Sequence, residues 1–181
     1  MKAEELINDL IDRVKGTMND AEKLKTLSDA ELNQRPNEGA WSALEAIQHL
    51  NRYGDFYTPE IRKRIKESRL AKSDAFKTGV LGDYFAKSVA PKEKLNKMKT
   101  FKNMNPAGSK LDRTVLDDFI FHQQQMLELL KEARNTNLTK VKTTITISKI
   151  IKLRLGDTFR VVIYHNQRHL VQALKAVRIK N

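Results

Sequence analysis

The stretch that does most to set the fold is WSALEAIQHL, at residues 41–50. In it, Ser42 is followed three residues later by Glu45, the pattern of a capping box in which each residue bonds the other's backbone amide. This pattern marks the start of a helix. The helix is predicted to continue to about Ser68, with a kink at Pro59, because proline removes one backbone hydrogen bond.

Three more long helices are predicted around this one. Apolar residues recur at spacings of three and four in each, which is the period of an amphipathic helix. The predicted ranges are Ala3–Leu27, Asp112–Arg134 and Gly156–Arg178, the last with Asp157 as its N-cap.

The segments between the helices are predicted from their helix-breaking glycines and prolines and from the alternation of apolar and polar residues. Residues 28–40 read as a loop, and residues 70–110 form a long connection interrupted by glycine and proline, with a short helix within Pro91–Lys99. Lys140–Ile147 alternates apolar and polar residues, which favours a short extended segment. We therefore expect an all-α fold: a four-helix bundle with one long crossover plus a short extended segment.

Length and composition limit the classes of protein to which the chain can belong. A chain of 181 residues suits a single domain, 1–181, and 40% hydrophobic residues are enough for a core. The chain has no cysteine, so it can form no disulfide and has no cysteine nucleophile. The apolar runs are too short to cross a membrane and the N-terminus is unlike a signal peptide, so we expect a cytoplasmic protein without a membrane partner.

Charge is unevenly spread along the chain. Residues 1–60 hold seven basic and twelve acidic side chains, a balance of −5, whereas residues 61–181 hold 27 and ten, a balance of +17. A basic half can bind nucleic acid. The lysines here come singly, without the interleaved aromatic residues of a single-strand binder, so a solvated surface is favoured over a nucleic-acid partner.

The chain contains four histidines, and two of them suggest a metal site. His165 and His169 are four residues apart in a predicted helix, so both rings project from one face. His49 lies about two turns into the capped helix. If the two helices face each other, the three imidazoles converge in a set that suits Zn²⁺ or Ni²⁺. Spacing alone leaves open the alternative of surface and core histidines without a metal.

Two motifs strengthen the prediction of a metal site, because they resemble motifs of a known protein family. Residues 41–50 resemble the Trp-Ser…His-Leu signature of the DinB-like superfamily, which includes the YfiT-type proteins. Residues 164–172, YHNQRHLVQ, are similar to the His-x-x-x-His-x-x-Gln element on that family's last core helix. The resemblance implies an up-down-down-up bundle, often dimeric, with His49, His165 and His169 as ligands of nickel or zinc. Gln172 and His122 are then candidates for contacts behind the ligands, although a hydrogen-bonded core histidine is favoured for His122.

The reaction stays open between three hypotheses. The resemblance favours a metal-dependent transferase that adds a small thiol, such as bacillithiol, to an electrophile. The alternatives are a hydrolase using metal-bound water and a non-catalytic, stress-related metal-binding or nucleic-acid-associated protein. No catalytic residue is assigned. Glu45, one turn before His49, is the nearest carboxylate, and its place in the capping box explains it better than a role as general base.

Overall fold

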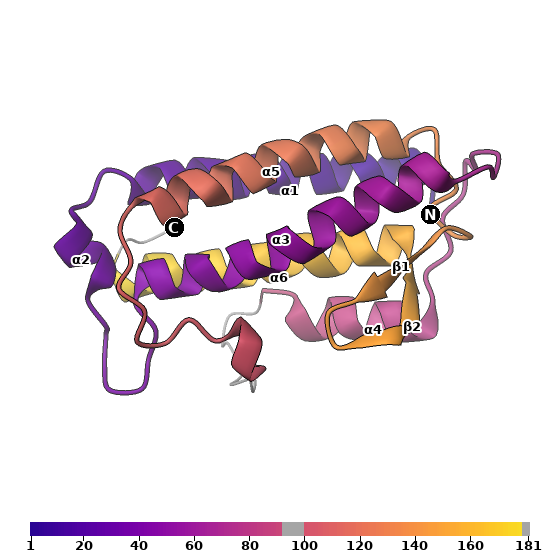
Figure 1. Ribbon diagram of the computed structural model, residues 1–181. Coiled ribbons are helices and arrows are strands. Elements are labelled where there is room, and N and C mark those ends of the chain that lie inside the picture. The colour runs from indigo at the N-terminus through magenta and orange to yellow at the C-terminus, as the bar shows by residue number, and fades with distance from the viewer. Residues whose placement is uncertain (92–99, 179–181) are drawn as a thin grey trace.

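The computed structural model describes residues 1–91 and 100–178, which are mostly helical and include one small two-stranded sheet (Figure 1). The all-α expectation is confirmed at this level. In chain order the elements are α1 (Ala3–Leu24), α2 (Asp29–Asn33), α3 (Ala43–Glu67), α4 (Val80–Val89), the 3₁₀ turn η1 (Lys102–Met104), α5 (Thr114–Ala133), β1 (Lys142–Ile145), β2 (Ser148–Arg154) and α6 (Leu155–Ala176).

The four long helices pack against one another. α1 and α3 each contact both α5 and α6 (Figure 1). The buried apolar residues fall into two clusters. Along α6, Ile163 belongs to one cluster and Leu170 to the other, and His165 and His169 lie between these two positions. The core therefore holds α3 and α6 together on both sides of the histidines.

The start of α3 is as the sequence predicts. The Ser42 amide donates to Glu45 Oε2 at 2.9 Å, and the Glu45 amide donates to Ser42 Oγ at 3.2 Å. Both residues are buried, so the two bonds satisfy amides that water does not reach. Pro59 lies inside this helix, as predicted.

Two short helices were not predicted. α2 lies in the expected loop 28–40, and it begins with a second capping box, formed by Ser28 and Glu31. α4 lies in the long connection, where it begins directly after Gly79 and contains Gly82, two glycines that read as breakers. A Cβ at Gly82 would overlap the Asp157 carboxylate, so this glycine permits close packing of α4 on α6 instead of ending a helix. The short helix expected within Pro91–Lys99 falls largely outside the described residues.

Asp157 does not cap α6, contrary to prediction. The N-cap is Arg154, and Asp157 is fully buried in the first turn. Its carboxylate accepts hydrogen bonds from Thr78 Oγ1 at 2.5 Å and from the Gly79 amide at 2.8 Å. The residue therefore joins the start of α4 to the start of α6, which are distant in sequence.

The extended segment is half of a hairpin. β1 lies within the predicted Lys140–Ile147, and it pairs antiparallel with β2, which was not predicted. The register shifts between Thr144 and Ile145, and this irregularity breaks the simple alternation by which a second strand could have been recognised.

Candidate metal centre

Three histidines from two helices come together between α3 and α6. His49 lies in α3, and His165 and His169 lie one turn apart in α6. One ring nitrogen from each is within 4.8 Å of the others, and the Nε2 atoms of His49 and His165 are 3.3 Å apart. Within the described residues this is the one group of three or more potential metal-ligating side chains that lie so close. The structure thus brings together the three residues that the sequence singled out.

The orientation of His49 is set by a backbone carbonyl. Its Nδ1 lies 2.8 Å from the Met104 oxygen. A carbonyl only accepts hydrogen bonds, so Nδ1 must be the donor and carry the proton. The lone pair of the neutral ring is then on Nε2, the nitrogen that faces His165. Nothing in the sequence pointed to Met104, because it acts through its backbone.

His169 has a partner of the same kind. Its Nδ1 lies 2.8 Å from Gln172 Oε1, so the side chain one turn further along α6 accepts from this ring. Partners behind a ring nitrogen fix the tautomer and angle of a metal-binding histidine. The position predicted for Gln172, behind the histidines, fits this contact.

Burial keeps the three imidazoles neutral. It lowers the pKa of His49 and that of His165, the latter well below its usual range, and it lowers the pKa of His169 to about 3. The neighbouring histidines and Arg168 add to the effect at His165 and His169, because each positive charge disfavours another. A neutral imidazole is the form that binds a metal ion, so this donor set fits a divalent transition metal.

Two aromatic rings enclose the histidines. Trp41, half-buried before α3, has its ring centroid 4.9 Å from that of His49 and 5.8 Å from that of His169. The ring centroid of Tyr53 lies 4.9 Å from that of His49 and 4.7 Å from that of His165. Burial raises the pKa of Tyr53 to about 12, so its hydroxyl keeps its proton. Tyr53 lies one turn beyond His49 on α3, and the sequence indicated no role for it.

The Glu45 carboxylate accepts hydrogen bonds from four N–H groups, two of them from Arg35, and is poorly suited to act as a base. The other two donors are the amides of Ser42 and Gly108. Burial alone would raise the pKa of Glu45, but these hydrogen bonds and the charge of Arg35 lower it on balance. The structural role predicted from the capping box therefore suffices to explain Glu45.

His122 lies outside the three-histidine cluster. Its ring packs against Gly54 of α3, where an added Cβ would be 2.8 Å away, and its Nε2 is 3.2 Å from Asp55 Oδ1. Its Nδ1 is buried and has no hydrogen-bond partner among the described residues. These contacts place His122 at the packing surface of α3 and α5.

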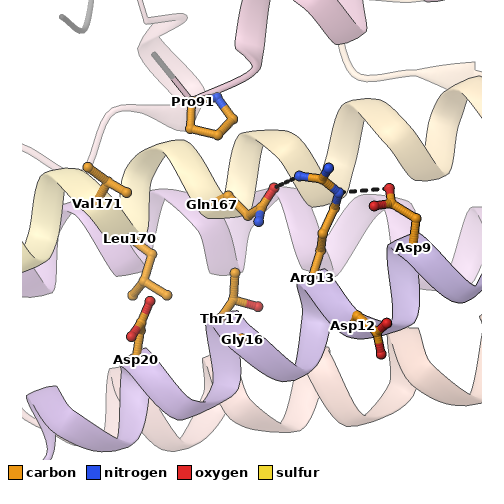
Figure 2. Close-up of a pocket in the computed structure, with 10 residues that line it drawn as sticks. All are labelled: Asp9, Asp12, Arg13, Gly16, Thr17, Asp20, Pro91, Gln167, Leu170 and Val171. Carbon is orange, nitrogen blue, oxygen red and sulfur yellow. Dashed lines mark hydrogen bonds and ion pairs between the residues drawn. The ribbon is translucent and has the colours of Figure 1, made fainter. Parts of the chain in front are cut away.

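A separate groove lies elsewhere on the molecule. It has a volume of about 440 Å³ between α1 and α6, and none of the three clustered histidines lines it (Figure 2). Arg13 crosses it, donating to Asp9 at 2.8 Å and to Gln167 at 3.1 Å.

None of the helices in the described part of the chain has the length and apolar character that a membrane span requires.

Comparison with known proteins identifies the family. The model of the DinB superfamily matches residues 17–173, which include α3, α5, and all three clustered histidines. No curated protein and no solved structure gives a significant match. The match covers most of the chain, so this protein belongs to the DinB superfamily.

Proposed function

We propose that this member of the DinB superfamily is a metal-dependent enzyme whose divalent ion, Ni²⁺ or Zn²⁺, is bound by the Nε2 atoms of His49, His165 and His169. The observation that carries the proposal is the orientation of the rings. Two of the three Nδ1 atoms are occupied by an oxygen acceptor, so the lone pairs of His49 and His169 are on Nε2. Three imidazole ligands leave a coordination position for a further molecule.

The reaction we favour is the transfer of a low-molecular-weight thiol, of the bacillithiol type, to an electrophile. The bound ion would supply positive charge that lowers the pKa of a thiol placed beside it. The thiol proton would be released to solvent, the sulfur would bond to the electrophilic carbon, and the leaving group would depart with the electron pair of its broken bond to that carbon. The chain itself has no cysteine, so the thiol must be a cosubstrate. Hydrolysis is the alternative reaction for the same ligand set.

The chain's own residues support this site in three ways. Met104 and Gln172 hold two rings in one tautomer. Burial keeps the imidazoles neutral and available as ligands. Tyr53, beside His49 and His165, retains a hydroxyl proton that can be donated to a bound substrate.

We also propose the family's up-down-down-up helix order and a homodimer. Three pairs of contacts support the helix order. α3 and α5 run parallel, because Gly54 meets His122 and the later Arg62 meets the later Glu132. α3 and α6 run antiparallel, because His49 meets His169 and the later Tyr53 meets the earlier His165. α1 and α5 also run antiparallel, because Glu4 meets Arg134 and the later Lys25 meets the earlier Asp117. Analytical ultracentrifugation would test the dimer, and a single monomer species would exclude it.

The experiment for the function starts from protein purified without a histidine tag. Elemental analysis should find close to one divalent transition metal per chain. The metal-loaded protein is then incubated with monochlorobimane and either bacillithiol or glutathione. Thiol-dependent product formation that is lost in His169→Ala supports the transferase. Hydrolysis of an ester without added thiol favours the hydrolase, and a salt-dependent nucleic-acid shift with no metal favours a binding protein.

A further inference from the structure

The segment that supplies the Met104 carbonyl is fastened to one face of α3. The Arg52 guanidinium donates from Nη1 to the carbonyls of Asn103, at 3.2 Å, and Asn105, at 2.8 Å. These two carbonyls flank Met104, whose own carbonyl accepts from His49. A third attachment follows, where the Gly108 amide donates to Glu45 at 2.8 Å.

The three attachment points on α3 share a side of the helix. Glu45, His49 and Arg52 are spaced by four and then three residues, so their side chains project in similar directions. Glu45 is almost fully buried and is itself held by Arg35. The segment from Asn103 to Gly108 is thus held at both ends and in its middle.

The segment has little regular structure of its own. η1 is a single 3₁₀ turn, closed by the Met104 amide donating to Phe101 at 2.9 Å. A turn this short lacks the cooperativity that stabilises a longer helix. The direction of the Met104 carbonyl therefore depends on the contacts that the segment makes with α3.

We propose that Arg52 is a positioning residue of the metal centre. It holds the peptide groups on both sides of Met104, so the carbonyl of Met104 stays aimed at Nδ1 of His49 and the lone pair of that ring stays on Nε2. This inference rests on the proposed function, because it supposes that Nε2 of His49 binds the metal. It assigns Arg52 no contact with the metal or the substrate.

A purely electrostatic role for Arg52 predicts the opposite result. Arg52 places a positive charge one turn from His49, and like charges repel. If that charge were its whole influence, removing it would tighten metal binding. If Arg52 positions the segment, removing it weakens binding. The sign of the change separates the two roles.

The test compares Arg52→Ala, Arg52→Lys and the control Lys63→Ala, which removes a charge from an exposed position of the same helix. Zn²⁺ affinity is measured by competition with a chelator. We expect about 10-fold weaker binding in Arg52→Ala, the usual scale for a partner behind a ligand, with part of the loss restored by lysine and none seen in Lys63→Ala. Unchanged or tighter binding in Arg52→Ala would overturn the proposal.

A second measurement needs no metal. Long-range ¹H–¹⁵N correlation spectra of the metal-free protein report which nitrogen of His49 carries the proton. The wild type should show protonated Nδ1, and Arg52→Ala should show a mixture of tautomers at an unchanged melting temperature. A single Nδ1–H tautomer in both proteins would contradict the positioning role. If the wild type binds no metal, the proposed function fails, and these spectra still decide the role of Arg52.

Discussion

The Nε2 atoms of His49 and His165 lie 3.3 Å apart although the two residues are 116 positions apart in the chain. One comes from the first half of α3 and the other from the middle of α6. Their rings meet at a centroid distance of 5.1 Å, within a core that clamps both helices. A metal bound here would link the early and late parts of the chain.

Acidification should destabilise the metal-free protein. Burial lowers the pKa of His169 to about 3 in the folded state, and it lowers the pKa of His49 and His165 as well. The unfolded chain, with ordinary histidine pKa values of about 6.5, takes up protons first as the pH falls. Stability is therefore full above about pH 6.5 and declines as the pH falls below it.

Melting curves of the metal-free protein at several pH values between about 7.5 and 5 measure this effect. His169→Leu removes one of the buried groups, so its melting temperature should fall less steeply with pH than that of the wild type. Parallel curves for the two proteins would mean that the folded state tolerates a charged His169.

Trp41 should report metal binding by its fluorescence. It is the sole tryptophan of the chain, and its ring lies 4.9 Å from that of His49 and 5.8 Å from that of His169. Ni²⁺ has a partly filled d shell that can take up excitation energy, whereas Zn²⁺ has a filled one. Titration with Ni²⁺ should quench the emission strongly, and Zn²⁺ should quench it much less. Equal emission with and without saturating Ni²⁺ in a protein shown to bind it would place the metal away from Trp41.

Gly54 should tolerate no side chain while His122 is present. A Cβ at this position would lie 2.8 Å from Cγ of the His122 ring, too close without movement of α3 or α5. We expect Gly54→Ala to destabilise the protein by about 1–3 kcal/mol, as overpacking does. In a His122→Ala background the cost should fall, because the ring is gone. Urea unfolding of the four proteins gives the coupling energy, and additive effects would rule out the contact.

Removing the Asp157 carboxylate should loosen α4 from the rest of the domain. This fully buried group accepts from Thr78, Gly79 and Arg160. Asp157→Ala leaves the Gly79 amide and the Thr78 hydroxyl without this acceptor, while Arg160 keeps its ion pair with Asp83. Each buried donor left without a partner typically costs about 1–3 kcal/mol. The matched control is Asp117→Ala, whose exposed pair with Lys25 should contribute little to stability. Similar unfolding free energies for the two variants would show that Asp157 does not anchor α4.

The long helices could be predicted because their signals are local. The capping box of Ser42 and Glu45 and the spacing of apolar residues act within one or two turns. α4 was missed because Gly79 and Gly82 look like breakers until Asp157, 75 residues beyond Gly82, is known to pack there. β2 was missed because a hairpin with an irregular register does not alternate cleanly.

The candidate site likewise has residues that the sequence could indicate and residues that it could not. His165 and His169 could be paired from their spacing, and His49 was joined to them by resemblance to a family motif. Met104 could not be found, because it contributes a backbone oxygen that any residue type has. Arg52 was equally hidden, since its partners are the carbonyls of a segment about fifty residues away.

The measurement that tests the central claim most directly is the melting temperature with and without added Ni²⁺ or Zn²⁺. A ligand that binds the folded state raises it, and the convergent site requires His49 from α3 to share the ion with the pair on α6. We predict a clear increase in the wild type and in His122→Ala, which lies outside the cluster, and a largely lost increase in His49→Ala. An equal metal-induced increase in His49→Ala and the wild type would contradict the three-histidine site.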